Sequence, residues 1–441
     1  MAAPIIRMTV LGTLARIIIL GSRYTQTLAD RIELSTPVTS WKLMTEGVFL
    51  LDHGISPYEG DNFHQPPLLL YLFFVIHKTA PSLIPLVFLF LDLTTAFLLY
   101  EVSKHLLRYL LNEQIREGPS YAKDVDVLLI KRASLSSIPG LVLSIYLLNP
   151  FSILTCAAQS TSIINNLMIA STFLLTLKGQ RISATLTLAL ASYQSLYPVM
   201  LIVPSAMHLA FLKMQERKET ISYSSRTAVS AILFTVGSFL IWCFILLGVS
   251  YTMLESWDFV RSTYGFTLSV TDLKPNLGLF WYYFMEMFEH FRIFFLWVFQ
   301  VHAFIYTLPL AIVLWKCPSF VFFCQLILMA VFKSYPSLGD TTVYFALLPV
   351  WSHAFHYLRN GLVISVMIVI SVVLAPVLWH LWIYAGSANA NFLFAFTLIY
   401  STAQIFLVTD LIFAFLRRSF SLQHGMKALK PDGTEKLVKL Q

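Results

Sequence analysis

Residues 361–383 read Gly-Leu-Val-Ile-Ser-Val-Met-Ile-Val-Ile-Ser-Val-Val-Leu-Ala-Pro-Val-Leu-Trp-His-Leu-Trp-Ile, with no carboxylate, lysine or arginine. A run of this length, wound as a helix, crosses the ~30 Å hydrocarbon layer of a bilayer. The whole chain has the same character, because 57% of its 441 residues are hydrophobic and only 12% are charged. Soluble domains carry roughly 25% charged residues. The composition therefore excludes soluble, disordered and disulfide-rich classes and predicts a chain that crosses a membrane many times.

Apolar runs recur to the end of the chain and predict an all-α polytopic membrane protein with twelve spans. A further run, 67–76, is too short to cross and is expected to form a re-entrant or interfacial hairpin. The first run carries Arg7 and Arg16 and lacks a small-x-small cleavage site, which predicts an uncleaved first helix. The expected domains are one multispanning unit, 1–416, and a cytoplasmic tail, 417–441. The predicted spans are 4–22, 82–101, 136–157, 159–178, 182–197, 198–212, 227–250, 291–315, 318–332, 341–356, 361–383 and 391–416.

Basic residues are concentrated in three stretches, 104–132, 213–226 and 417–439. If all three face the cytoplasm, the twelve spans alternate without conflict and both termini are cytoplasmic. The two longest loops on the opposite side, 23–80 and 251–290, are rich in aromatic, acidic and amide residues and contain amphipathic runs suited to interfacial helices. The basic residues are dispersed between spans rather than gathered on a soluble face, so no nucleic-acid partner is expected. No internal repeat is apparent, which argues against a transporter built from duplicated halves.

The first long loop contains two candidate acid pairs. It resembles the first lumenal loop of integral-membrane glycosyltransferases that use dolichyl-phosphate-linked sugars, where two carboxylates converge on one hydroxyl or one cation. Asp30 and Glu33 match an Asp-x-Asp pattern poorly, since Arg31 lies between them, and a salt-bridged helix end is the simpler interpretation. Asp52 with His53 is an alternative acid–base pair, with a polar turn as its simpler interpretation.

The second long loop ends in a polar cluster at the mouth of the next span. Glu286, Glu289, His290 and Arg292 are spaced by three and four residues and share one face of a helix. The spacing is not His-Glu-x-x-His, so an interfacial cluster that contacts a polar ligand is favoured over a metal site. No metal and no cofactor is expected. The four cysteines, which lie in or at the ends of apolar runs, are interpreted as small buried thiols.

Two shorter external breaks complete the candidate rim. In 332–340, Pro336 and Gly339 leave backbone groups that protein, water or a ligand must satisfy, although a tight turn is the simpler interpretation. In 384–391, the amides of Asn389 and Asn391 present donors and acceptors suited to sugar hydroxyls. Within the spans the clearest charges are Asp92 and Asp410, each interpreted equally well as a packing residue or a functional one.

Several segments together carry a resemblance to a known family. They are Ala-Ser-Tyr-Gln-Ser-Leu-Tyr-Pro at 191–198, Gly-Leu-Phe-Trp-Tyr-Tyr-Phe at 278–284, Phe-Lys-Ser-Tyr-Pro at 332–336 and Pro-Val-Leu-Trp-His-Leu-Trp-Ile-Tyr-Ala-Gly-Ser-Ala-Asn at 376–389. With them the chain resembles, from end to end, the phosphatidylinositol glycan anchor biosynthesis class U family of GPI transamidase subunits. The resemblance implies an endoplasmic-reticulum complex that removes a C-terminal signal from a precursor protein and attaches a GPI anchor.

The same resemblance implies what this subunit contributes. Catalysis is expected on another subunit, a cysteine protease, and the fold is expected to be that of the GT-C lipid-linked mannosyltransferases without their established activity. The family's Phe-x-Ser-Tyr-Pro-x-x-x-Asp motif corresponds to Phe332, Ser334, Tyr335, Pro336 and Asp340 and is expected to face the lipid anchor. A working dolichyl-phosphate-sugar glycosyltransferase and a transporter remain the alternatives.

The resulting expectation is a non-catalytic subunit that helps to recognise and present the GPI lipid. No residue is expected to be catalytic. Phe280, Trp281 and Phe284 are expected to stack on sugar or to line a groove. Arg217 and Lys218, at the cytoplasmic end, are candidates for an anionic headgroup, with topology signals as the simpler interpretation. The expected GPI-binding residues are Asn389, Asn391, Arg292, Lys218, His290, Glu289, Tyr335 and Asp340.

Overall fold

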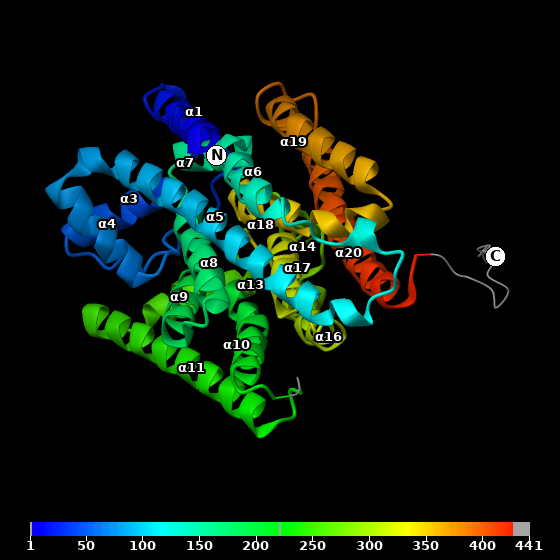
Figure 1. Ribbon diagram of the computed structural model, residues 1–441. Helices are drawn as coiled ribbons and strands as arrows, with labels where there is room; N and C mark the ends of the chain where they lie inside the picture. Colours follow the sequence, from blue (N-terminus) through cyan, green and yellow to red (C-terminus); the bar gives the residue numbers. More distant parts are fainter. Residues whose placement is uncertain (1, 220–221, 427–441) are drawn as a thin grey trace.

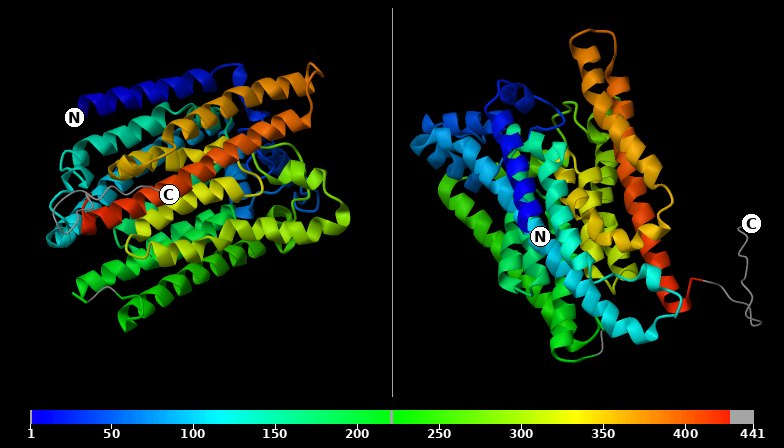
Figure 2. Two further views of the ribbon diagram at one scale, coloured as in Figure 1. Left: turned by 90° about the vertical axis from the view of Figure 1, so that its right-hand side faces the viewer. Right: turned by 45° about the horizontal axis from the view of Figure 1, so that its top comes forward.

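The computed structural model describes residues 2–219 and 222–426. Every regular element in these residues is helical, which confirms the expected all-α class (Figure 1). The helices run roughly along a common direction and are joined by short turns, apart from two long loops (Figure 2). The part of the tail beyond Met426, which the sequence analysis assigned to the cytoplasm, lies outside the described residues.

Six helical segments in the described part of the chain are long and apolar enough to cross a bilayer. Two further helices, α6 (Ser134–Leu148) and α7 (Pro150–Ala157), meet at 47° and make a seventh if they are counted as one span. The expected number of twelve is therefore not confirmed. The six are Pro81–Ser120 around α5 (Ile84–Glu117), Tyr197–Glu216 around α10 (Ile202–Glu216), α11 (Arg226–Leu254), Glu289–Val313 with α15 (Glu289–Ile305) and α16 (Thr307–Val313), α19 (Gly361–Ile383) and α20 (Ala390–His424).

The predicted span 136–157 is broken at Asn149 and Pro150. Proline cannot donate the backbone hydrogen bond that a continuous helix needs, and its ring clashes with the preceding turn. The Asn149 side chain accepts a hydrogen bond from Phe151 N at 3.0 Å and so caps the second helix. The residues on both sides of the break are apolar, so hydropathy predicted one continuous span and did not reveal that the helix axis changes direction there.

The predicted span 341–356 is likewise divided. It contains parts of three short elements, η6 (Leu338–Thr341), α18 (Thr342–Leu347) and η7 (Leu348–Tyr357), the last of which has Pro349 in its first turn. At the C-terminal end, α20 runs on to His424, past the predicted boundary at 416. The run at 67–76 forms α4 (Pro67–Thr79), which at 1.5 Å per residue is too short to cross a bilayer.

The remaining helices complete the bundle and its long loops. The first long loop contains α2 (Tyr24–Ala29) and α3 (Trp41–Asp52), and the second contains α12 (Asp258–Val260), α13 (Phe266–Ser269) and α14 (Phe280–Met285). The other members are α1 (Ala2–Leu20), α8 (Ser162–Leu177), α9 (Arg181–Gln194) and α17 (Pro318–Phe332). The left view of Figure 2 places the long loops and the α19–α20 hairpin at one end of the bundle, called here the loop end. The end of α5, the α10–α11 connection and the end of α20 lie at the opposite end, called here the basic end.

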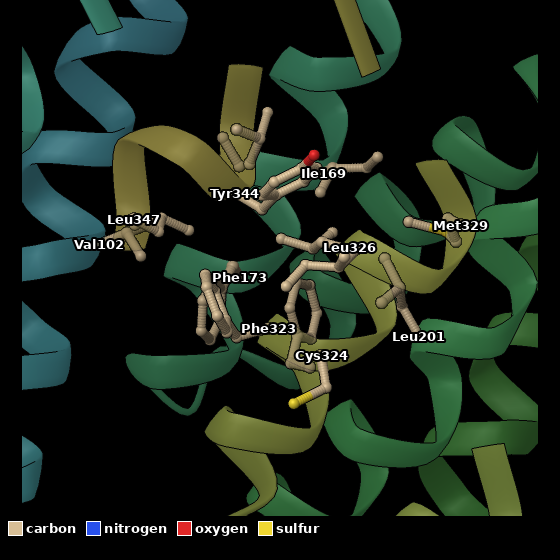
Figure 3. Packing of buried hydrophobic residues seen from close by; sticks show 14 of the residues in the cluster. Val102, Ile169, Phe173, Leu201, Phe323, Cys324, Leu326, Met329, Tyr344 and Leu347 are labelled. Carbon is tan, nitrogen blue, oxygen red and sulfur yellow. The ribbon is translucent and has the colours of Figure 1, made fainter. Parts of the chain in front are cut away.

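The centre of the bundle is α17, whose residues 318–331 are all buried. Figure 3 shows its side chains Phe323, Leu326 and Met329 among those of Phe173 and Leu201 from α8 and the turn before α10. Phe322 of α17 stacks on Phe173 with ring centroids 4.2 Å apart. A helix that is apolar on every face is stable either in a protein core or in lipid, and the structure places this one in the core.

Both charges that the sequence placed within spans have structural partners. Asp92 forms a buried ion pair with Arg16, with 2.5 Å between Oδ2 and Nε, and accepts a hydrogen bond from Tyr146 OH at 2.7 Å. This contact ties α1 to α5 and α6. Asp410 accepts hydrogen bonds from the backbone N–H groups of Arg359 and Asn360, at the start of α19. These contacts join helices to one another, so they support the interpretation of Asp92 and Asp410 as packing residues.

Candidate functional site

The first candidate acid pair of the first long loop, Asp30 and Glu33, is divided between two basic residues. Glu33 binds Arg31 through both carboxylate oxygens, at 2.7 and 3.1 Å. Asp30 lies 3.4 Å from Lys42 Nζ, and both side chains are exposed. These contacts confirm the salt-bridge interpretation, because the two carboxylates do not converge on a shared hydroxyl or cation as sugar transfer requires.

The alternative acid–base pair of this loop is also neutralised. Asp52 forms an ion pair with Lys78 at 2.9 Å, and the hydrogen bond from Lys78 lowers the pKa of the Asp52 carboxyl. A carboxylate with a lowered pKa is a weak base, so this arrangement does not suit general-base catalysis near neutral pH. The neighbouring His53 is bonded to the backbone oxygen of Phe49 through Nδ1, at 2.9 Å.

Asn389 and Asn391 form an exposed polar rim at the start of α20. Asn389 is the N-cap of the helix, since its side-chain oxygen accepts hydrogen bonds from the backbone N–H groups of Asn391 and Phe392 at 3.1 and 3.4 Å. The side-chain oxygen of Asn391 accepts a hydrogen bond from Tyr282 OH of α14. Within the described part of the chain, the amide N–H groups of Asn391 therefore have no partner, while the Asn389 oxygen is used by the helix end.

The polar cluster at the start of α15 is only partly assembled as predicted. Arg292 lies 3.7 Å from Glu289, one helical turn away, and also donates a hydrogen bond to the backbone oxygen of Val270 at 3.0 Å. The second contact fastens α15 to the end of α13. Glu289 and His290 are exposed and lie next to Phe291 and Phe288, which are exposed as well. The cluster thus has a cationic group held in place beside an open apolar surface.

The short helix α14 joins this cluster to the asparagine rim. Its Trp281 packs with residues of α19 and α20, and its Phe280 and Phe284 pack against α15 and Tyr335. All three rings are at least 97% buried. They are therefore core residues, not an exposed surface that stacks on sugar, and none of them is among the residues that line the apolar groove described below.

Tyr335 and Asp340 are bound up in internal contacts of the 332–340 segment. Asp340 forms a largely buried ion pair with Lys333 at 2.7 Å and accepts a hydrogen bond from Ser337 N at 2.7 Å. Tyr335 is 1% exposed and donates a hydrogen bond to the backbone oxygen of Asp272 at 2.9 Å. Asp340 therefore shapes the segment, and Tyr335 holds the second long loop against it.

Ser334 is the centre of a hydrogen-bond network in the same segment. Its hydroxyl donates to the backbone oxygen of Thr267 at 2.9 Å and accepts from Gln300 Nε2 at 2.9 Å. Tyr197 OH lies 2.7 Å from the same hydroxyl, and Ser334 N donates to Tyr197 OH at 3.0 Å. The network links the second loop, α15 and the turn before α10, so this motif is a junction between elements far apart in the chain.

A small polar cavity lies beside this junction. It has a volume of about 30 Å³ and is lined by residues that include His64, Asn165, Gln194, Lys333 and Asp340. The side-chain oxygen of Asn165 is buried there without a hydrogen-bond partner among the described residues. A cavity of this size holds one or two waters. It is too small for a sugar ring, so the junction does not contain a preformed glycosyl-transfer site.

A larger apolar groove lies between the first loop, α7, α19 and α20. Its volume is about 300 Å³. The Arg31–Glu33 ion pair lies at its wall, and almost all of its remaining lining is apolar. Sequence reasoning did not identify this groove, because it exists only where helices from both ends of the chain meet. Its other lining residues include Tyr24, Leu28, Phe151, Leu154, Val372, Ala375, Phe396 and Tyr400.

Lys218 is separated from the other predicted site residues. It is exposed in the turn after α10, at the basic end of the bundle, and has a left-handed backbone conformation with φ of 54°. The neighbouring Arg217 donates a hydrogen bond to Thr227 at 3.2 Å. The structure therefore brings Asn389 and Asn391 together with α14, and Arg292 close to α14, but leaves Lys218 at the far end.

The comparison with known proteins identifies the family. A sequence model described as "GPI transamidase subunit PIG-U" matches residues 10–400. The chain belongs to the PIG-U family. It is 42% identical over 447 residues to the "GPI-anchor transamidase component PIGU" of Homo sapiens, covering all of both chains. It is 31% identical to the "GPI transamidase component GAB1" of Saccharomyces cerevisiae, covering 89% of each chain. This PIG-U family member therefore spans its animal relatives from end to end, and the expected resemblance is confirmed.

Proposed function

We propose that this PIG-U family member is a non-catalytic subunit of a GPI transamidase complex in the endoplasmic-reticulum membrane, where it helps to recognise and present the GPI lipid. The observation that carries the proposal is the full-length similarity to proteins named as components of that transamidase. In this proposal the other transamidase subunits are its partners, and a cysteine-protease subunit performs the covalent chemistry.

The absence of a catalytic role is supported by how the acids are used. Asp30, Glu33 and Asp52 each have their own basic partner. The cavity beside the 332–340 junction admits water rather than a sugar. The alternative of a dolichyl-phosphate-sugar glycosyltransferase requires two free carboxylates at a sugar-sized site, and these contacts do not favour it.

The proposed lipid site joins the asparagine rim to the apolar groove. Asn391 lies five residues before Phe396 and nine before Tyr400 on α20, which at 1.5 Å per residue places the groove roughly 8–14 Å deeper along the helix. A GPI molecule has a glycan on a phosphate and apolar tails, and this depth separates a polar rim from a lipid-filled groove. Asn391 would bind sugar hydroxyls, and an acyl chain would occupy the groove.

The other predicted residues have different parts in this proposal. Arg292, with Glu289 and His290, provides a second contact in which the guanidinium pairs with a phosphate. Tyr335 and Asp340 support the second loop from inside and position the rim through α14 rather than touching the lipid. Lys218 is proposed to contact only a headgroup at the basic end, where α10 ends.

The test of the rim replaces the asparagines while keeping the helix cap. Asn391→Ala removes the free amide, and Asn389→Ser retains a side-chain acceptor for the helix end. Loss of one such hydrogen bond costs about 1–2 kcal/mol, or a roughly fivefold to thirtyfold loss of affinity. We therefore expect the Asn391→Ala complex to assemble normally. After purification it should retain less GPI than the wild-type complex, in line with this loss of affinity.

The matched control is Asn62→Ala in the first long loop, where the amide lies 3.4 Å from Glu46 and is exposed. This variant should retain GPI as wild type does. If Asn391→Ala assembles and holds GPI equally well, Asn391 is not part of the lipid site.

The groove is tested by filling it. Leu154→Trp puts a large ring into the cavity wall, whereas Leu233→Trp puts the same ring on the outer face of α11, where Leu233 is 66% exposed. Only the first should lower GPI retention. Equal retention by both variants would show that no tail occupies this groove.

The proposed orientation has both termini in the cytoplasm. A glycosylation acceptor introduced at 265–275 should be modified in the endoplasmic reticulum, and one placed in the C-terminal tail should not. Modification of the tail, or of neither site, would contradict the orientation derived from the basic residues.

A further inference from the structure

A second cavity, of about 290 Å³, lies at the basic end of the bundle, far from the asparagine rim. Its walls are the last turns of α5, the turn between α16 and α17, and the last turns of α20, which Figure 1 shows converging on the same side of the molecule. The lining is half polar and half apolar, unlike that of the groove near α19. None of the contacts proposed above involves this site.

The loop 121–130 builds one wall of this cavity and is firmly fixed. Ala122 N donates to Leu422 O at 2.9 Å, and the Gln114 side chain binds both the N–H and the carbonyl of Ile130 at 2.7 and 3.2 Å. Val125, Leu128 and Leu422 form a small buried cluster beneath the loop. The cavity is thus enclosed by ordered contacts rather than by a loosely placed connection.

Arg418 lines the cavity, is only 7% exposed, and has no carboxylate partner among the described residues. Its Nε donates to the backbone oxygen of Leu128 at 3.0 Å, and neither Nη group has a hydrogen bond within the described part of the chain. Desolvating a guanidinium without an opposing charge is expensive. Burial raises the pKa of the neighbouring Tyr121 phenol to about 12, so that group is neutral and does not compensate the charge. An anionic group from outside the described chain would complete the site.

Other residues that line the same cavity, a carboxylate and two apolar side chains, indicate which chemical groups a ligand would carry besides its anionic group. Glu117 lines the wall opposite α20, and its described partner is the Tyr121 hydroxyl at 3.3 Å, not a basic residue. Leu416 and Phe420 line the cavity and are 40% and 50% exposed. A phosphate beside a cation, an ammonium beside a carboxylate and an apolar exit together describe a zwitterionic phospholipid.

We propose that this cavity binds the headgroup of an amino-phospholipid of the phosphatidylethanolamine class, with its phosphate on Arg418, its ammonium near Glu117 and its acyl chains along Leu416 and Phe420. Basic pockets between helices at the cytoplasmic membrane surface are established headgroup sites. A guanidinium suits this role because it donates two parallel hydrogen bonds to phosphate oxygens. The site is a structural lipid position, independent of the GPI contacts proposed above.

The test uses the full-length chain, purified in mild detergent, stripped of lipid and titrated with phosphatidylethanolamine or phosphatidylglycerol carrying identical acyl chains. Binding is counted by native mass spectrometry. Arg418→Gln should weaken phosphatidylethanolamine binding by at least about tenfold, as expected for the loss of a charge-assisted hydrogen bond. The control Arg417→Gln, which removes an exposed arginine from the same helix turn, should bind as wild type does.

Glu117→Gln is a second variant at an exposed position, so it tests the proposal even if Arg418→Gln does not fold. It should reduce the preference for phosphatidylethanolamine over phosphatidylglycerol and leave binding of phosphatidylglycerol intact. An unchanged preference would contradict the proposed ammonium contact.

Three further outcomes would overturn the assignment. Displacement of the lipid by excess inorganic phosphate would show a site for the free anion, because the acyl chains would then contribute nothing. Lipid binding only after deletion of residues 427–441 would show that the tail, rather than a lipid, occupies the cavity. Equal phosphatidylethanolamine binding by folded Arg418→Gln and wild type would also exclude the site.

Discussion

Replacing Arg16 with Met is expected to be among the most destabilising single changes in this chain. The Arg16 side chain is fully buried and binds Asp92 at 2.5 Å, Leu147 O at 2.7 Å and both Gly12 O and Ser152 Oγ at 3.0 Å. Its removal leaves the Asp92 carboxylate buried with a single donor from Tyr146. Breaking a buried pair in this way costs about 3–5 kcal/mol.

The double variant separates the ion pair from the packing. Asp92→Leu alone leaves a buried guanidinium and is expected to cost a similar amount, so independent effects would sum to about 6–10 kcal/mol. Removing both charges eliminates the unpaired ion, and the principal penalty is then the unpaired Tyr146 hydroxyl, about 1–3 kcal/mol. The double variant should therefore be more stable than either single variant or equal to the better one.

The assay is unfolding by sodium dodecyl sulfate, followed by the fluorescence of the 9 tryptophans. Arg7→Met is the matched control, since Arg7 lies on the same helix and is exposed. It should change the free energy of unfolding by less than about 0.5 kcal/mol. Additivity of the two single variants within about 0.5 kcal/mol would refute the coupling, because residues that share an interaction are not additive.

Two other predictions concern the long loops. A Cβ on Gly278 would lie 2.7 Å from Pro336 Cδ, so Gly278→Ala should lower the unfolding free energy by about 1–3 kcal/mol, whereas Gly237→Ala, with nothing within 4 Å, should not. Burial lowers the pKa of His64 below 6.5. Its neutral form is therefore favoured by folding, and the contribution of His64 to thermal stability should be constant above about pH 6.5 and fall as the pH drops below it. His64→Phe should remove this component of the pH dependence; an unchanged slope would show that His64 does not cause it.

The GPI-binding role of the candidate site residues stays a prediction, and the structure adds which contacts these residues make within the protein. Asn389 and Asn391 were expected at an exposed helix end, and they are there. The sequence offered no means of seeing that Asn389 is occupied as the helix cap while Asn391 binds Tyr282, 109 residues away. The same holds for Trp281, whose burial depends on two helices that follow it much later in the chain.

The membrane spans likewise show which features the sequence could predict and which it could not. Hydropathy correctly marked 361–383 and 227–250 as long apolar helices, since those runs are uninterrupted. It did not register the 47° bend at Asn149 and Pro150, because the residues on both sides of the break remain apolar. Pro150 and Pro349 lie where the two predicted spans are broken, but Pro139 and Pro376 lie inside continuous helices, so proline by itself does not locate the breaks.

The amino-acid sequence by itself determined that this chain is helical and membrane-embedded, which segments are apolar, and which family it belongs to. These properties follow from residues that are neighbours along the chain, where composition and period are sufficient. Tertiary structure alone decided which polar groups are available. Arg418 has the appearance of a topology signal in the sequence, yet it is buried against Leu128, 290 residues away, beside a cavity. Burial and pairing depend on contacts between distant helices, and those contacts exist only after the bundle has packed.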